Sequence, residues 1–443
     1  MNRNTIARLL LFAVASPAAA QSDLRDSIAE HYRDHLGELF VHFHKNPELS
    51  LLETRTAARL AGELRAEGVE VTEGIGGTGI VGLLKNGEGP LVLVRADMDG
   101  LPVEENSGLE YASRARQVNR DGREVPVMHA CGHDVHITSL VGTARQLAQN
   151  RNLWSGTVMF IGQPAEEVIS GARNMLVDGL YERFGVPDYA LAFHVSAGDP
   201  AGKVQVRSGP IAASSDSVDI IVRGIGAHGA SPHKGKDPIY IGSQIVIALQ
   251  GIVSREVPPR RPAVVTVGAF HAGLKHNIIS DEAHLQLTVR STDRETRDQL
   301  LSAIDRIAKG VGRANGLPDE LLPEVHFSKT QTTPPTVNDP KLAERIRGVF
   351  AKELGEDMLY MSVNEGMGAE DFAYFVSTEH DVPGCYFEVG GTSEGDLDIE
   401  RAGGTPVASH HSPFFRIEPE PAVISGSHAM TLAVLELLRK GDN

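Results

Sequence analysis

Three short apolar runs, separated by stretches with helical spacing, constrain the fold of this chain more than any other feature of its sequence. The runs are residues 91–96, 157–161 and 189–193. Their continuous apolar character is typical of strands that are buried on both faces. The helical stretches between them are residues 137–148 and 172–184. This alternation predicts an α/β fold, in which helices cover both faces of a largely parallel sheet.

From about residue 215 the order of the expected elements changes, which predicts a second domain inserted into the first. Strands are expected at 218–222, 263–269, 283–290 and 324–328, and helices at 237–254 and 293–310. This order is that of the ferredoxin-like βαββαβ unit. With 443 residues, the chain is also too long for one compact core. We therefore expect a main domain in two parts, 21–210 and 331–443, with an inserted domain at 211–330.

The first 20 residues have the organisation of a secretory signal. Arg3 and Arg8 precede an apolar stretch, and small residues at 18–20 offer a cleavage site before Gln21. This predicts export to the periplasm or the cell exterior, and an N-terminal anchor helix is the alternative. The net charge is −16, which disfavours nucleic acids and anionic membrane surfaces as partners.

Polar side chains that could bind a metal or act as a base follow each of the three apolar runs. Asp97 and Asp99 follow the first run. Glu166 and Glu167 follow the second run, and His194 follows the third. In open α/β sheets, chemistry takes place beyond the carboxyl ends of the strands. We therefore expect these side chains to share one site.

Residues 128–136, Met-His-Ala-Cys-Gly-His-Asp-Val-His, add three histidines, a cysteine and an aspartate to this expected site. One glycine separates Cys131 from His133, and in a tight turn this spacing lets the sulfur and the imidazole approach one ion. Hydrolytic sites with two ions need several ligands, a bridging anion and a free carboxylate as general base. The thiolate can bridge, and of two adjacent glutamates one can bind while the other carries the proton. His410 or His411 could complete the ligand set.

Each of these residues alone also has a simpler explanation. Cys131 and Cys385, the two cysteines of the chain, could form a disulfide. Cys131 with a neighbouring histidine could instead be the nucleophile of a cysteine hydrolase. A binding protein without catalytic activity is a further alternative. Residues 391–395 match the serine-hydrolase elbow, but we expect no helix after them, which argues against an elbow.

Five stretches in order along the chain resemble the aminoacylase/carboxypeptidase family of binuclear metallohydrolases, peptidase family M20. Within it they resemble the amidohydrolase subgroup that contains hippurate hydrolase and the plant auxin-conjugate hydrolases. The stretches are Arg95-Ala96-Asp97-Met98-Asp99-Gly100-Leu101-Pro102, Met128-His129-Ala130-Cys131-Gly132-His133-Asp134, Gln163-Pro164-Ala165-Glu166-Glu167, Ala227-His228-Gly229-Ala230-Ser231-Pro232-His233 and His411-Ser412-Pro413. They are spread over nearly the whole of the expected mature chain.

The resemblance implies a role for each matching residue. The expected metal ligands are Cys131, which would be shared between the ions, His133, Glu167, His194 and His411. Glu166 matches the family's general base, and Asp99 matches the acidic residue that orients a ligand histidine from behind. The inserted domain would be a lid and a dimerisation module. In it, His228 would reach the scissile carbonyl, often in the partner subunit, and Asn277 would contact the substrate.

The implied reaction is hydrolysis of the amide bond of N-acyl amino acids, such as hippurate-like or N-acetyl compounds, by a water that bridges two divalent ions. Glu166 would move the proton. A carboxypeptidase or dipeptidase of the same family is the alternative. Zinc and manganese are expected first, and cobalt and nickel also suit these ligands. Residues 114–125 form a longer polar stretch than is usual in the family, and Arg290 could contact a substrate carboxylate or face outward.

Overall fold

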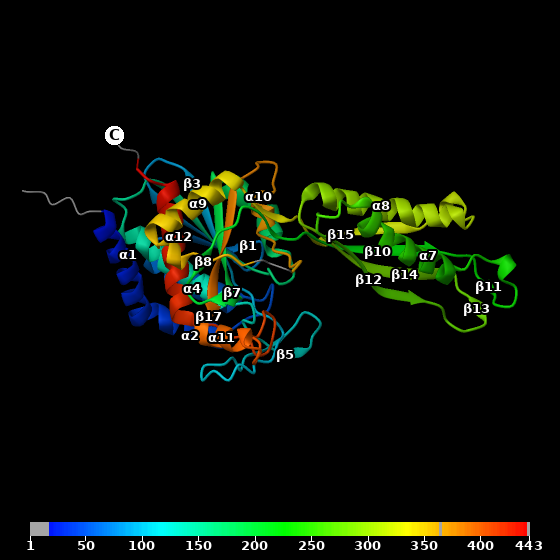
Figure 1. The fold of residues 1–443 in the computed structure, drawn as a ribbon, viewed down its shortest axis with the longest axis horizontal. Helices are drawn as coiled ribbons and strands as arrows, with labels where there is room; N and C mark the ends of the chain where they lie inside the picture. Colours follow the sequence, from blue (N-terminus) through cyan, green and yellow to red (C-terminus); the bar gives the residue numbers. More distant parts are fainter. Residues whose placement is uncertain (1–16, 363–365, 441–443) are drawn as a thin grey trace, which may run out of the picture.

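A seven-stranded sheet organises the main domain of the computed structural model, which describes residues 17–362 and 366–440 (Figure 1). Its strands are β1 (Glu70–Ile75), β2 (Gly79–Asn86), β3 (Leu91–Asp97), β6 (Gly156–Gln163), β7 (Tyr189–Pro200), β8 (Val204–Gln205) and β17 (Gly384–Thr392). Their order across the sheet is β1, β2, β6, β3, β7, β17, β8. The strands β6, β3, β7 and β17 are mutually parallel, whereas β1, β2 and β8 pair antiparallel with their neighbours.

Helices cover both faces of this sheet. One apolar core contains residues from α1 (Pro17–His31), α2 (Gly37–Lys45), α3 (Thr54–Ala66), α4 (His133–Gln149), α9 (Pro340–Glu353) and α12 (Pro419–Leu437). The opposite core contains residues from α5 (Gly171–Val177), α6 (Leu180–Phe184) and α10 (Ala373–Val376). Alternate residues of a strand face opposite sides, so Val92 and Val94 enter the first core and Leu93 enters the second. The predicted α/β fold with a largely parallel sheet is confirmed.

Residues 215–333, which we call the lid, form a separate antiparallel sheet that extends away from the main domain (Figure 1). The lid consists of β10 (Ser215–Arg223), α7 (Pro238–Gly251), β12 (Ala263–Ala272), β14 (Glu282–Ser291), α8 (Arg294–Ala314) and β15 (Glu324–Thr333). The strand order is β12, β14, β10, β15, and every pair is antiparallel. With two helices connecting the strands, this is the arrangement of the ferredoxin-like unit.

Two short antiparallel pairs mark the ends of the lid. At the junction with the main domain, β9 (Gly209–Ala212) pairs with β16 (Thr336–Asn338). At the other end, β11 (Ala227–His228) pairs with β13 (Ile278–Ile279). The polar stretch noted in the sequence forms a hairpin of β4 (Arg116–Val118) and β5 (Glu124–Pro126).

The expectation that no helix follows residues 391–395 is wrong. Helix α11 (Glu394–Arg401) begins directly after β17. Ser393 is its N-cap, and the hydroxyl accepts a hydrogen bond from the main-chain nitrogen of Asp396 at 3.1 Å. Acidic residues in the first turn also stabilise this end of the helix. The cap and these acidic residues together outweigh the destabilising effect of the glycine within the helix. The serine hydroxyl is thus used as a cap, and no hydrogen bond joins it to a histidine of the described residues.

The disulfide considered from the sequence is also wrong, because Cys131 and Cys385 are both free and buried. None of the helices in the described part of the chain combines the length and the apolar character needed to cross a membrane. Most of the predicted signal, residues 1–16, lies outside the described residues. Export therefore stays a prediction.

Candidate active site

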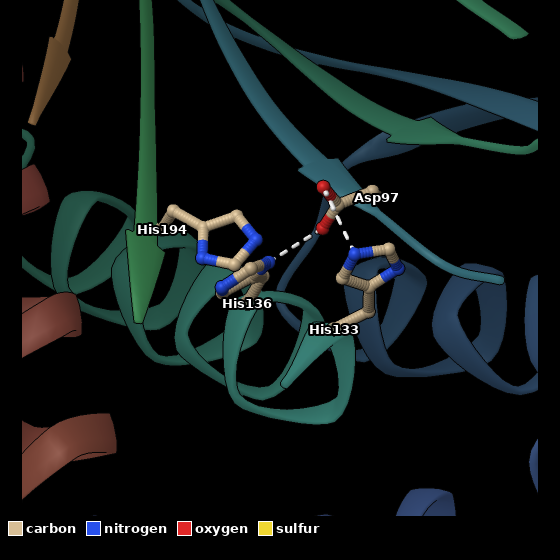
Figure 2. Close-up of side chains that lie close together, drawn as sticks. All are labelled: Asp97, His133, His136 and His194. Carbon is tan, nitrogen blue, oxygen red and sulfur yellow. Dashed lines mark hydrogen bonds and ion pairs between the residues drawn. The ribbon is translucent and has the colours of Figure 1, made fainter. Parts of the chain in front are cut away.

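The carboxyl ends of the parallel strands and the N-terminus of α4 bring the predicted residues together. Asp97 is the last residue of β3, His194 lies on β7, and His133 is the first residue of α4. Figure 2 shows these three side chains and His136 directed towards one another. These three residues come from segments up to about one hundred residues apart in the sequence, which meet at one edge of the sheet.

The turn that presents Cys131 and His133 requires glycine between them. Gly132 has φ +83°, in the left-handed region that glycine adopts without strain. A Cβ atom at this position would lie 2.3 Å from Cγ1 of Val195. The close approach of β7 therefore leaves room for no side chain, and the cysteine and the histidine remain on the same side of the turn.

His133 and His194 both direct Nε2 towards the site. Nδ1 of His133 donates to the main-chain oxygen of Asp99 at 2.8 Å, and Nδ1 of His194 donates to the main-chain oxygen of Val195 at 2.7 Å. In the neutral form of each ring, the form that binds a metal ion, the other nitrogen carries a lone pair. Nε2 of His194 lies 3.4 Å from Sγ of Cys131, and Nε2 of His133 is buried without a hydrogen-bond partner.

Glu167 connects these groups to the C-terminal part of the chain. Its Oε1 lies 3.9 Å from Nε2 of His133, and its Oε2 lies 3.3 Å from Nε2 of His411. Ligand atoms of Cys131, His133 and Glu167 all lie within 4.8 Å of one another. His411 has φ +65°, a strained value for a residue other than glycine, and its main-chain nitrogen donates to the oxygen of Ala130 at 2.8 Å. The structure therefore brings all five predicted ligands together.

The two adjacent glutamates lie in a strained turn that Asp99 holds in place. Ala165 has φ +54° and Ile169 has φ +52°, so left-handed residues flank the pair on both sides. Each such residue costs about 1–2 kcal/mol. The Asp99 carboxylate accepts hydrogen bonds from the main-chain nitrogens of Glu166 and Glu167, both at 3.1 Å. Asp99 thus orients His133 through its carbonyl oxygen and the glutamate turn through its carboxylate.

The charges and unpaired atoms of the cluster fit a pair of divalent cations. Burial raises the pKa of Cys131 well above its ordinary value, and Glu167 and Glu166 raise it further. Burial also raises the pKa of Glu167 to about 8. Oε1 of Glu167, like Nε2 of His133, is buried without a partner. An anionic thiolate and carboxylates at this distance are stable together only beside positive charge, and thiolate, imidazole and carboxylate are suitable ligands for zinc-like ions.

Two neighbouring histidines use their ring nitrogens elsewhere. Nδ1 of His136 donates to Oδ1 of Asp97 at 2.5 Å, and its Nε2 accepts from the main-chain nitrogen of Val195 at 2.9 Å. Nε2 of His410 accepts from the main-chain nitrogen of Ala197 at 3.2 Å. Of the two histidines that the sequence left open at the end of the chain, only His411 directs a ring nitrogen at the cluster.

A buried ionic network that the sequence analysis missed lies next to Glu166. Arg95 is fully buried and contacts carboxylates of Asp97 and Glu370, both at 2.7 Å. Tyr386 donates to Glu370 at 2.8 Å. Burial raises the pKa of Glu166, and Glu370 raises it further. The one signal in the sequence is an adjacent acidic pair at 370–371, which is too far along the chain to be assigned to this site.

Glu166 opens into a cavity of about 720 Å³, which we call the central cavity. Its lining includes Cys131, Glu167, His194 and His411. The volume is in the range of cavities that hold small molecules. The five predicted ligands and the predicted base thus surround or adjoin a space that a small substrate can enter.

Two predicted site residues, His228 and Asn277, do not join this cluster. Both are exposed, and the main-chain oxygen of Asn277 accepts from Gly229 at 2.9 Å, so the two residues are neighbours. His228 belongs to β11 and Asn277 precedes β13. Figure 1 shows these strands at the end of the lid that is far from the central sheet.

Behind the cysteine–histidine turn, His44 bridges two buried carboxylates. Its Nδ1 lies 2.7 Å from Oδ2 of Asp134, and its Nε2 lies 3.2 Å from Oε1 of Glu105. Burial alone lowers the pKa of His44, but the hydrogen bonds to Asp134 and Glu105 outweigh burial and raise the pKa to about 9. Asp134 also accepts from the main-chain nitrogen of Val135 at 3.0 Å. The imidazolium thus anchors the first turn of α4, directly beside His133.

The substitution His44→Gln is expected to destabilise the protein more at pH 6 than at pH 9.5. The folded-state pKa of about 9 lies above the ordinary value of 6.5. The protonated histidine therefore contributes fully below about pH 6.5, and the contribution is lost as the pH rises through about 9. The size of this pH-dependent part is roughly 3 kcal/mol. Urea unfolding of both proteins at the two pH values measures it, and an equal difference at both would contradict the bridge.

Comparison with known proteins identifies the family. The sequence pattern described as "Peptidase family M20/M25/M40" matches residues 93–404. The chain belongs to peptidase family M20. A hippurate hydrolase of Campylobacter jejuni is 40% identical to this M20 chain over 333 residues, which is 75% of this chain and 82% of that protein. Thermostable carboxypeptidase 2 of Saccharolobus solfataricus is 39% identical over 355 residues, 79% of this chain and 84% of the relative.

A solved M20 structure is similar over nearly the whole chain. The crystal structure of a dinuclear metal-binding M20 peptidase of Bacillus subtilis superposes with a TM-score of 0.73 at 29% identity, and the match covers 93% of this chain and 100% of that one. The prediction of a hydrolase acting on amide or peptide bonds is confirmed. The ligand cluster and this relative support two metal ions. The identity of the metal and the role of each residue stay predictions.

Proposed function

We propose that this M20 enzyme is an amidohydrolase that cleaves N-acyl amino acids. The observation that carries the proposal is the convergence of five side chains that can bind metal, and of the Glu166 carboxylate, beside the central cavity. A free carboxylate beside a metal cluster is what hydrolysis of an unactivated amide requires. The similarity to a protein named hippurate hydrolase supports the choice of substrate class.

In the proposed reaction, Glu166 moves the proton. Divalent ions held by the cluster would supply Lewis acidity, which acidifies water and polarises the amide carbonyl. Glu166 accepts a proton from the attacking water and passes it to the amine nitrogen as the C–N bond breaks, so that the water oxygen remains on the acyl carboxylate. Burial and, after it, Glu370 raise the pKa of Glu166, whereas bound cations would lower it again and keep the carboxylate ready to accept the proton.

Arg290 supports a substrate that carries a carboxylate. It lies on β14 of the lid and lines the central cavity. No carboxylate of residues 17–362 or 366–440 lies within ion-pair distance of it, and its hydrogen bonds are long contacts to Thr288 and Met367. A guanidinium binds a carboxylate through two parallel hydrogen bonds. The amino-acid half of an N-acyl amino acid provides such a group.

A substrate panel tests the proposed activity. The purified protein is expected to release amino acids from hippurate or N-acetyl amino acids and to cleave dipeptides more slowly. The similarity to a protein named carboxypeptidase makes peptide hydrolysis the second candidate. Cleavage of peptides alone would favour that candidate and contradict the amidohydrolase proposal.

Exhaustive chelation is expected to abolish this activity, and zinc or manganese is expected to restore it. The physical reason is that the cluster without cations leaves a buried thiol and carboxylates with nothing to polarise the substrate. Metal content by mass spectrometry is measured beside activity. Activity that survives chelation but is lost after thiol alkylation would contradict the metal mechanism and favour Cys131 as a nucleophile.

The proposed enzyme acts as a dimer through its lid. The strand β12 lies at the edge of the lid sheet, where its backbone groups are open to pairing. Large apolar side chains nearby are exposed, including Ile247 at 73% and Leu274 at 88%. A second copy paired there would cover this surface, and His228 could then reach the central cavity of the partner.

The substitution His228→Ala is expected to lower kcat by about 100-fold or more, because it removes a donor to the developing oxyanion. Metal content and dimer mass are expected to stay the same. Heterodimers of His228→Ala and Glu166→Gln chains provide the control. If His228 acts in the partner's site, one site of each heterodimer has both residues intact. If it acts in its own subunit, neither site does. Recovery of activity on coexpression supports a shared site, and no recovery in verified heterodimers contradicts it.

We further propose that the enzyme is exported and that its mature chain begins at Gln21. The signal-like residues 1–20 support this. N-terminal sequencing of the protein from the periplasm or medium tests it, and retention of residues 1–20 in the cytoplasm would contradict it.

A further inference from the structure

One wall of the central cavity carries a carboxylate with no cationic partner among residues 17–362 and 366–440. Asp199 lies near the end of β7, on the same strand as His194. It lines the cavity together with His194 and His411, and only 9% of the residue is exposed. It belongs to none of the three groups whose ligand atoms are close enough to share an ion. The expected metal ions therefore do not neutralise the charge of Asp199.

The hydrogen bonds of Asp199 all reach one of its two oxygens. Oδ2 accepts from the hydroxyls of Ser196 at 2.5 Å, Tyr360 at 3.1 Å and Ser362 at 3.4 Å. Oδ1 has no hydrogen bond from the described residues. A carboxylate can accept about four hydrogen bonds over its two oxygens. The three hydroxyls thus fix the orientation of the side chain, and Oδ1 remains free to accept from a ligand in the cavity that Asp199 lines.

A second carboxylate in the same wall, Glu388, differs from Asp199 because it has a cationic partner. Glu388 also lines the cavity, and it pairs with His194 across the β7–β17 ladder. Its oxygens accept from Arg207 at 3.2 Å and from Gln205 at 2.5 Å. Glu388 therefore has a cation and an amide as partners, whereas Asp199 has three neutral hydroxyls.

A nearly buried carboxylate without a counter-ion raises the free energy of the protein, because the charge has lost part of its hydration. A ligand that brings a cation offsets this loss. We infer that Asp199 binds an ammonium group of the substrate. This inference rests on the proposed amidohydrolase function and narrows it to N-acyl amino acids that carry a positive charge. The charge can lie on the acyl group or on the side chain of the amino acid, since both halves of the substrate occupy the central cavity.

Matched substrates with and without an ammonium group test the inference. Benzoyl-glycine is the reference without an ammonium group, 4-(aminomethyl)benzoyl-glycine carries the ammonium group on the acyl half, and benzoyl-lysine carries it on the amino acid. In Asp199→Asn the amide oxygen can still accept from the hydroxyls, but the negative charge is lost. In this variant we expect kcat/KM for one of the two substrates with an ammonium group, divided by kcat/KM for benzoyl-glycine, to fall by about 10-fold to 100-fold. The substrate that is affected identifies the half that Asp199 binds.

Two further variants separate recognition from structure. Asp199→Ser, which is smaller and also neutral, is expected to shift the same ratio. Glu379→Gln removes one negative charge at a side chain that is 88% exposed, and it is expected to leave the ratios unchanged. An equal loss on all three substrates, or no change in either ratio, would overturn the role of Asp199 and leave the proposed activity intact. A wild-type enzyme that cleaves N-acetyl amino acids but none of the three would overturn this inference alone. One that cleaves neither class would overturn the proposed function and this inference with it.

Discussion

The substitution Glu166→Gln is expected to lower kcat by at least about 100-fold while the metal stays bound. Glutamine has nearly the same shape as glutamate but cannot accept the proton of the attacking water. The main-chain nitrogen of Glu166 donates to Asp99, a contact that glutamine preserves. Steady-state kinetics on hippurate or an N-acetyl amino acid, with metal content measured on the same sample, checks this result.

The neighbouring residue provides a matched control. Glu167→Gln changes the adjacent carboxylate of the same turn, one that contacts His133 and His411. It is expected to lose metal as well as activity, because it removes a predicted ligand. If Glu166→Gln lost the metal and Glu167→Gln retained it, the roles of the two glutamates would be reversed. If Glu166→Gln retained full kcat, another group would be the base.

The substitution Arg95→Met is expected to lower the free energy of unfolding by about 3–5 kcal/mol. Arg95 and Asp97 are fully buried, and Glu370 is nearly so. Methionine fills much of the same volume but removes the buried guanidinium that both carboxylates contact. Urea unfolding of the metal-free protein measures the loss separately from any effect on metal binding.

An exposed ion pair is the control for this change. Arg65 lies 2.7 Å from Glu73, and its side chain is 48% exposed. The substitution Arg65→Met is expected to cost less than about 1 kcal/mol, since water screens such pairs. Equal effects of the two substitutions would show that the buried network contributes no more than a surface pair.

The parts of the site that could be predicted from the sequence lie in short local segments. Cys131 and His133 are separated by one residue, and Glu166 and Glu167 are adjacent. Each segment follows or precedes an element with a clear apolar pattern, so its place at the edge of the sheet follows from the α/β fold. His411 required the family resemblance, because nothing in its local sequence indicates which strand end it approaches.

The parts that could not be predicted depend on contacts between distant residues or on polar residues inside the fold. Arg95 lies in an apolar run, and its pairing with Glu370 joins residues that no local pattern connects. His44 appears in the sequence as one more polar residue of a helix, yet it is 4% exposed and held between two acids. Helix α11 could not be predicted because its sequence is acidic and contains glycine, and its start depends on a single serine cap.

The position of β17 in the central sheet has a consequence for the synthesis of the protein. This strand lies between β7 and β8, although about 180 residues of chain separate it from them. Until it has been made, β7 has an open edge with apolar residues on both faces, which is the kind of strand that pairs with other chains. A truncated chain that ends before residue 384 is therefore expected to aggregate instead of folding into a smaller enzyme. The complete sheet, and with it the approach of His411 to Glu167, has to wait for the last part of the chain.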